Sequence, residues 1–261
     1  MNRDLMPAQH FPVSESIAHR VRVKAQKILY YVVSGYWVTG ERLHPLFVTN
    51  NYINHLRVYQ FVSQFTQGKQ VLDVGCGVGY GTDFLSRTAS RSVGIDLAQI
   101  AIDEAFRLYP ANEFLKMDAE NMEFPSQSFD VIVSTENFEH LPNQAKHVQE
   151  LARVVRKEGF CFVATPNPEL FVGYDNPFHT KENTYSELRD LMLERFREVE
   201  ILEPTRIPIN PTGRAAWEER YNRGVHGKIV TPDLEIFGQK VNQTFLSNTH
   251  SFQCFARDPI P

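Results

Sequence analysis

The sequence contains little cysteine, with three residues among 261 and no spacing typical of a disulfide framework. A secreted protein that depends on disulfides is therefore not indicated. An excess of basic residues is also missing, because 27 lysines and arginines stand against 31 acidic residues and the formal net charge is −4. This balance gives no general attraction to nucleic acid or to an anionic membrane surface. We expect small molecules or other proteins as partners.

Long hydrophobic runs are absent as well. The longest nearly apolar stretch, residues 28–38, is interrupted by Ser34 and Gly35 and is too short to cross a bilayer. The first eleven residues, MNRDLMPAQHF, lack the basic region and the apolar block of a secretory signal. We therefore expect a cytoplasmic protein without a membrane segment. With 42% hydrophobic residues, the chain can still bury a folded core.

From about residue 70 onward, short β-type runs alternate with helical patterns. This alternation is typical of a parallel sheet built from strand–helix–strand units. One predicted helix spans residues 143–157, and another begins with a capping box formed by Thr184 and Glu187. The seven predicted strands span residues 70–75, 92–97, 113–118, 129–135, 159–165, 197–202 and 249–256.

Two segments fall outside this alternation. Apolar residues at Ile17, Val21 and Ala25 predict an amphipathic helix near the N-terminus. A polar stretch over residues 204–245 separates the last two predicted strands and is too long for an idle loop. We therefore expect an N-terminal helical cap over residues 1–65 and an α/β domain over residues 66–261. That domain would carry a lid-like insertion at about residues 204–245.

The segment VLDVGCGVGYG, residues 71–81, places four glycines between a predicted strand and a predicted helix. Glycine permits positive φ and lets a ligand touch the backbone. The dinucleotide pattern G-x-G-x-x-G would need a glycine where this sequence has Tyr80. Asp73, two residues before the loop, would repel a pyrophosphate, yet it suits a ligand with an ammonium group. The loop therefore predicts a nucleotide-like ligand other than a dinucleotide.

Acidic residues end the next two predicted strands. Asp96 closes the segment SVGIDL, where a carboxylate can accept hydrogen bonds from both hydroxyls of a ribose. Asp118 closes the following strand and can accept from the exocyclic amine of adenine while the Ala119 amide meets the ring. Each aspartate alone is a common turn residue. In order on consecutive strands, they predict a site for an adenosine group.

With these motifs together, the sequence resembles the class I S-adenosylmethionine-dependent methyltransferases. The matching segments are VLDVGCGVGYG, VGIDLA, KMDAENMEFPSQSFDVIVSTENFEHLPN and ARVVRKEGFCFVATPN. The resemblance implies an α/β, Rossmann-like seven-stranded sheet of order 3-2-1-4-5-7-6, with the last strand antiparallel and helices on both faces. TPN at 165–167 and NPFH at 176–179 look like bacterial members that act on small metabolites or sugar-containing molecules.

The resemblance also implies S-adenosylmethionine as cofactor and assigns residues to it. The loop glycines and Asp73 would surround the amino-acid part, and Glu136 would lie near the methionine part. Asp96 and Leu97 would hold the ribose. Apart from the resemblance, we also expect Arg57 to approach the carboxylate of the cofactor. The complete expected set is Asp73, Gly75, Gly77, Gly79, Asp96, Leu97, Asp118, Ala119, Glu136 and Arg57.

The implied reaction moves a methyl group to an oxygen or nitrogen of a small acceptor. A hydroxyl acceptor usually needs a general base, and histidine has a suitable pKa. His140 and His179 are the catalytic candidates, because both follow predicted strands at the ligand end of the sheet. The alternative for each is a histidine that orders its loop. We expect no metal site.

The acceptor pocket would be closed by segments outside the sheet. Its candidate residues are Tyr52, Tyr185, Trp217 and Tyr221, for which core packing is the alternative. The alternative function is a non-catalytic sensor or scaffold that binds S-adenosylmethionine, since a glycine loop reports binding rather than chemistry. Nucleic-acid methylation fits less well, because STENF is not the motif that grips a flipped base. The acceptor, and the choice between monomer and homodimer, stay open.

Overall fold

The computed structural model describes residues 42–46, 48–170, 176, 178–203, 228–229, 235–240 and 251–260. All of them belong to one compact unit, residues 40–261. Most of the expected N-terminal cap and of the insertion at 204–245 lies outside the described residues. Within the described part of the chain, no helix is both long and apolar enough to cross a membrane.

The strands form one mixed sheet in the order β3-β2-β1-β4-β5-β10-β6-β7. Five strands pair in parallel: β1 (Gln70–Val74), β2 (Arg91–Asp96), β3 (Glu113–Lys116), β4 (Phe129–Thr135) and β5 (Val155–Pro166). The last long strand, β10 (Ser251–Pro259), runs antiparallel between β5 and β6 (Phe196–Glu203). The predicted order 3-2-1-4-5-7-6 is confirmed. The short β7 (Lys228–Ile229) extends the sheet beyond β6 and was not predicted.

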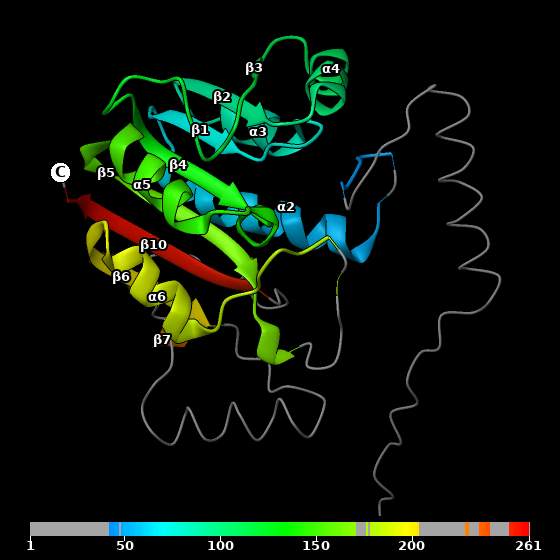
Figure 1. Cartoon of the computed structure of the whole chain (residues 1–261). Coiled ribbons are helices and arrows are strands. Elements are labelled where there is room, and N and C mark those ends of the chain that lie inside the picture. The colour runs from blue at the N-terminus through cyan, green and yellow to red at the C-terminus, as the bar shows by residue number, and fades with distance from the viewer. Residues whose placement is uncertain are drawn as a thin grey trace, which may run out of the picture. The chain divides into compact units, whose positions relative to one another are not determined.

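Helices cover both faces of the sheet, as predicted (Figure 1). One face carries α2 (Asn50–Val62), α3 (Tyr80–Ser86) and α4 (Gln99–Leu108). The other carries α5 (Gln144–Val154) and α6 (Tyr185–Leu193). The remaining elements are the short helices η1 (Ser63–Phe65), η2 (Phe138–His140) and η3 (Pro168–Leu170), and the hairpin of β8 (Glu235–Ile236) and β9 (Gln239–Lys240).

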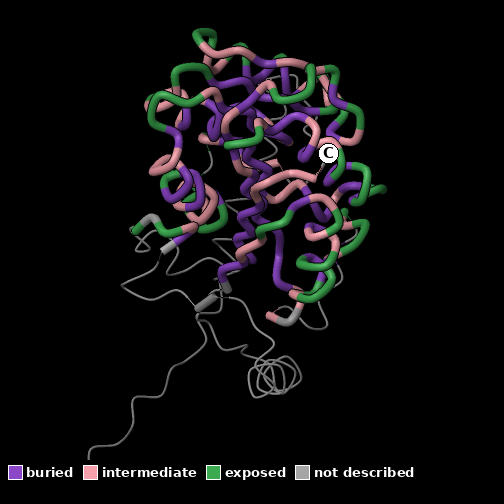
Figure 2. Tube along the Cα trace, turned by 90° about the vertical axis from the view of Figure 1, so that its left-hand side faces the viewer, coloured by how far each residue is buried: buried purple, intermediate pink, exposed green. Residues whose placement is uncertain are grey.

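The two faces follow from the alternation of side chains along each strand. In β4, Val131 and Val133 belong to the core beneath α2 and α3, whereas Ile132 belongs to the core beneath α5 and α6. Successive residues of a strand point to opposite faces, so a strand buried on both sides reads as a continuous apolar run. Buried residues accordingly concentrate along the sheet (Figure 2).

Capping residues define where several helices begin. Thr49 accepts a hydrogen bond from the backbone N–H of Tyr52 at the start of α2, and Asn143 accepts one from that of Lys146 near the start of α5. The predicted capping box of α6 is confirmed, because Thr184 and Glu187 each accept a hydrogen bond from the other's backbone N–H. These caps satisfy N–H groups that have no partner within the helix.

Candidate cofactor and acceptor site

The glycine loop connects β1 to α3 at the carboxyl end of the parallel strands, where open α/β sheets bind ligands. Gly75, Gly77 and Gly79 all have positive φ, at 74°, 55° and 85°. A Cβ atom on Gly75 would lie 2.5 Å from the Asn137 side chain, and one on Gly79 would lie 2.6 Å from Phe114. A Cβ atom on Gly77 would meet no described atom within 4 Å. Among the loop glycines, only Gly77 has open space where a Cβ atom would lie.

Asp73 lies at the centre of a buried hydrogen-bond network. Its carboxylate accepts from the Tyr59 hydroxyl at 3.0 Å and from the Thr82 hydroxyl at 2.7 Å. The side chain is fully buried, and burial raises its pKa to about 6. The network joins α2, β1 and α3 beneath the loop. The expected contact of Asp73 with an ammonium group stays a prediction.

Asp96 joins the second strand to the glycine loop. One carboxylate oxygen accepts from the backbone N–H of Gly77 at 3.0 Å, and the other accepts from that of Ala98 at 2.9 Å. The Arg42 guanidinium lies 3.4 Å from the same carboxylate. Leu97 follows directly and is exposed at the rim. Asp96 and Gly77 therefore lie side by side at the carboxyl end of the parallel strands, and their expected contacts with the cofactor stay predictions.

Asp118 and Ala119 follow β3. The Asp118 carboxylate accepts from the backbone N–H of Glu120 at 2.8 Å, which is the geometry of a turn residue. The carbonyl of Ala119 lies 2.9 Å from Nδ1 of the buried His147 and accepts a hydrogen bond from it. Their expected contact with adenine stays a prediction.

Glu136 has a strained backbone just beyond β4. Its φ is 48°, although it is not glycine, and such a conformation persists only where the surroundings enforce it. Its N–H donates to the Ala164 carbonyl at 2.8 Å, and its carboxylate accepts from the Ser251 hydroxyl at 2.5 Å. The ends of β4, β5 and β10 thus meet at this residue. Strain of this kind clusters at functional sites.

The structure brings His140 and His179 together, although 39 positions separate them. Their ring centroids lie 5.0 Å apart. Nδ1 of His140 lies 3.0 Å from the Phe178 carbonyl, and Nδ1 of His179 lies 2.5 Å from a Glu182 carboxylate oxygen. Because a carbonyl can only accept, Nδ1 of His140 carries the proton and Nε2 keeps its lone pair. This tautomer is the one that a general base requires.

Sequence reasoning missed Glu139, which lies beside this histidine pair. Its side chain is only 1% exposed and accepts from the Thr165 hydroxyl at 3.0 Å. The other carboxylate oxygen lies 3.9 Å from Nε2 of His140. Burial, followed by the nearby Glu136 carboxylate, raises the pKa of Glu139 well above its usual value. The only sequence signal was its place within FEH, one residue before a candidate histidine.

The other expected residues are placed as follows. Arg57 donates to the Asn54 side chain at 3.3 Å along α2. Tyr52 is buried, with its ring 4.9 Å from that of Tyr80. Tyr185 packs against the core, with its ring 6.3 Å from that of Phe252. Both tyrosines thus contact core aromatics, and their contact with an acceptor stays a prediction. Trp217 and Tyr221 lie outside the described residues.

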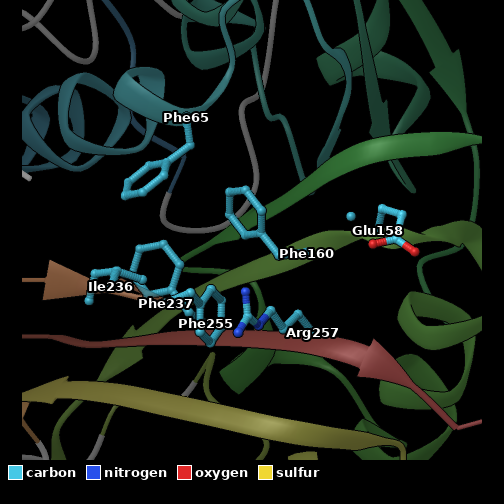
Figure 3. A pocket seen from close by; sticks show the side chains of 8 residues that line it. Phe65, Glu158, Phe160, Ile236, Phe237, Phe255 and Arg257 are labelled. Atoms are coloured by element: carbon cyan, nitrogen blue, oxygen red, sulfur yellow. The ribbon is translucent and has the colours of Figure 1, made fainter. Parts of the chain in front are cut away.

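A separate pocket lies near the amino end of β5 and is shown in Figure 3. Its wall includes Phe65, Phe160, Phe237 and Phe255. The guanidinium of Arg257 lies 4.1 Å from the ring centroid of Phe237 and also pairs with a carboxylate of β6. This pocket contains none of the residues expected to bind cofactor or acceptor.

The sequence of this chain is similar to the sequences of known methyltransferases. Residues 72–163 match the family described as "Methyltransferase domain". An S-adenosylmethionine-dependent methyltransferase of Mycobacterium tuberculosis, named as probable, is 36% identical over 163 residues, which cover 60% of each chain. A phthiotriol/phenolphthiotriol dimycocerosates methyltransferase of the same species is 37% identical over 109 residues, or 40% of each chain. The chain thus spans about 60% of the length of the first of these relatives.

Solved structures share the fold. An S-adenosylmethionine-dependent methyltransferase from Thermotoga maritima, titled as a possible histamine N-methyltransferase, aligns with a TM-score of 0.56 and 16% identity, covering 91% of this chain and 96% of its own. One from Mesorhizobium loti aligns with a TM-score of 0.52 and 15% identity, covering 78% of this chain and 97% of its own. These alignments show that the chain has the fold of these methyltransferases, and residues 72–163 match the methyltransferase domain.

Proposed function

We propose that this chain transfers a methyl group from S-adenosylmethionine to an oxygen or nitrogen atom of a small molecule. The observation that carries the proposal is the glycine loop, in which the open backbone of Gly77 is hydrogen-bonded to the strand-end carboxylate of Asp96. An amino-acid group against the loop and a ribose against Asp96 would place the cofactor along the carboxyl ends of β1 and β2.

Methyl transfer needs alignment and removal of one proton. The acceptor atom forms a bond to the methyl carbon while the carbon–sulfur bond breaks, and that electron pair neutralises the sulfonium. The proton of a hydroxyl or amine acceptor must then leave. His140 is the better candidate for this step, because its Nε2 keeps a lone pair while Nδ1 donates to the Phe178 carbonyl. In His179, both ring nitrogens already hold hydrogen bonds, to Glu182 and Asn176.

The acceptor is proposed by chemical class only. One relative is named for phthiotriol, and the ending of that word denotes hydroxyl groups. This supports an oxygen acceptor, within the limit that the match covers 40% of each chain. A sugar-containing molecule or a secondary metabolite has the same functional group.

Calorimetric titration with S-adenosylmethionine, S-adenosylhomocysteine and NAD tests cofactor binding. We expect the first two to bind with one site per chain and NAD not to bind. Binding of NAD, or of none of the three, would contradict the proposal.

Turnover needs a second experiment, because a sensor would bind the cofactor equally well. Methyl-labelled S-adenosylmethionine is incubated with a panel of hydroxyl- and amine-bearing metabolites, and labelled product is measured. His140→Ala should lower turnover by about 100-fold or more, the usual contribution of a general base. Its affinity for the cofactor should stay near that of the wild type. Cofactor binding without any methylated product would favour the sensor.

A further inference from the structure

We propose that Glu139, His140 and His179 form a site for one divalent transition-metal ion at the acceptor side of the methyltransferase domain. One ligand atom from each residue, two imidazole nitrogens and a carboxylate oxygen, lies within 4.8 Å of the other two. Ligands of a tetrahedral ion with bonds of about 2.0–2.1 Å lie roughly 3.3 Å apart. Small side-chain rotations would therefore close the three atoms around an ion.

The far nitrogen of each imidazole already has the partner that a metal-bound histidine needs. Metal-binding histidines usually donate their other N–H to a carbonyl or a carboxylate, which fixes the ring and directs the lone pair to the metal. His140 donates to the Phe178 carbonyl at 3.0 Å, and His179 faces the Glu182 carboxylate at 2.5 Å. Nε2 of His179 now accepts from the Asn176 amide at 3.0 Å, a bond that the ion would replace.

Glu139 supplies the second argument. A buried carboxylate is costly unless a positive charge balances it. The described hydrogen bonds and ion pairs of Glu139 include a threonine hydroxyl and His140, but no lysine or arginine within the part of the chain that the structure describes. A divalent cation bound to the Glu139 carboxylate would supply that balancing charge.

The ligand set selects the kind of ion. Two imidazoles and one carboxylate suit Zn²⁺, Fe²⁺, Mn²⁺ or Co²⁺, whereas Mg²⁺ and Ca²⁺ prefer oxygen ligands. Three protein ligands leave a coordination position open for an acceptor oxygen. The use of that position rests on the proposed function: the ion would lower the pKa of a coordinated hydroxyl, which would give its proton to solvent water, while His140 would act as a ligand instead of the base.

Activity alone cannot separate these two roles, because His140→Ala lowers turnover whether His140 is a base or a ligand. Metal binding separates them. The full chain, without a histidine affinity tag and stripped by a chelator, is titrated with Co²⁺ and followed by its visible ligand-field absorption. We expect one Co²⁺ per chain at this site, displaced by Zn²⁺. His140→Ala and His179→Ala should lose the absorption, and Glu182→Gln should weaken binding about 10- to 100-fold.

Co²⁺ binding by Glu139→Gln is compared with Co²⁺ binding by Glu194→Gln. The control variant has the same chemical change at the exposed C-cap of α6, so it should bind Co²⁺ like the wild type. Circular dichroism shows whether each variant is folded. If the Glu139→Gln variant does not fold, the Co²⁺ absorption of the two histidine variants tests the metal site instead. No absorption in the wild type, or unchanged absorption in both histidine variants, overturns the metal site. Calorimetry with S-adenosylmethionine reports separately on the proposed function, since the cofactor residues are different ones.

Discussion

At the scale of single residues, the glycines of the loop between β1 and α3 are needed for different reasons. Gly75 and Gly79 are needed by the fold, because a side chain there would collide with Asn137 or Phe114. Gly77 has open space on the side where a Cβ would point, although its φ is also positive. Gly68, in the turn before β1, has the same two properties, with φ at 70° and no described atom within 4 Å of a Cβ. Gly68 is therefore a matched control for Gly77.

We expect Gly77→Ala and Gly68→Ala each to lower the free energy of unfolding by about 1–2 kcal/mol, the cost of alanine in the left-handed region. Only Gly77→Ala should lower the affinity for S-adenosylmethionine, by about tenfold or more, because only its methyl group would occupy the ligand side of the loop. Urea unfolding and calorimetry measure the two quantities. Equal cofactor affinities in both variants would show that the ligand does not approach Gly77.

A second residue-scale prediction concerns pH. Burial lowers the pKa of His147 from 6.5 to about 4. Between these values the unfolded chain binds a proton that the folded chain does not, so stability falls as the pH falls through this window. From pH 7 to pH 5, His147 should account for about 2 kcal/mol of the loss. In His147→Gln the loss should be smaller by that amount.

Urea unfolding of both proteins at the two pH values gives this difference. Asp73 and His55 also titrate in or near the window, but they are present in both proteins and cancel. An identical loss in wild type and variant would mean that His147 is protonated in the folded state.

At the scale of elements, local patterns predicted most of the sheet. Every predicted strand is present, because alternation or continuous apolar runs reflect burial on one or both faces. The boundary between α5 and β5 was wrong: the helical pattern runs on to Lys157, yet the strand begins at Val155. Val155 pairs with Phe129 of β4, and that distant pairing overrides the local helical period. The two-residue β7 leaves no pattern long enough to detect.

The capping box of α6 gives an element-scale prediction. Thr184→Ala removes the hydroxyl that accepts from the backbone N–H of Glu187. We expect the free energy of unfolding to fall by about 1 kcal/mol. Cofactor affinity should not change, because this cap lies outside the glycine loop. Chemical denaturation with a parallel calorimetric titration tests both statements, and a loss of cofactor affinity would show that α6 contributes to the site.

At the scale of the whole molecule, the site was predictable only in part. The glycine loop and Asp96 follow consecutive strands, so their meeting is a consequence of parallel pairing, and sequence reasoning found it. The meeting of Glu139, His140 and His179 depends on the path of a loop. The N–H of Thr180 donates to the Glu139 carbonyl at 2.8 Å, a contact between segments about forty positions apart. No local pattern contains that information.

The burial of all three cysteines gives a prediction for the whole fold. Cys76, Cys161 and Cys254 are buried, and burial raises the pKa of each thiol. A thiol reagent should therefore modify them only through global unfolding, and slowly, because the thiolate is the reactive form. Timed labelling in water and in urea, read by mass spectrometry, measures this. Fast labelling of Cys76 in water would instead reveal local opening of the glycine loop.

The position of β10 also has a consequence for how the protein is made. β10 separates β5 from β6 in space, yet both precede it in the chain. While a ribosome is still translating the residues between β6 and β10, β6 has no partner on the side where β10 belongs. Until β10 emerges, β6 therefore cannot join the sheet through its pairing with β10, and the parallel strands β1–β5 fold before it. This interval is when a chaperone, or another nascent copy, would find an exposed strand edge.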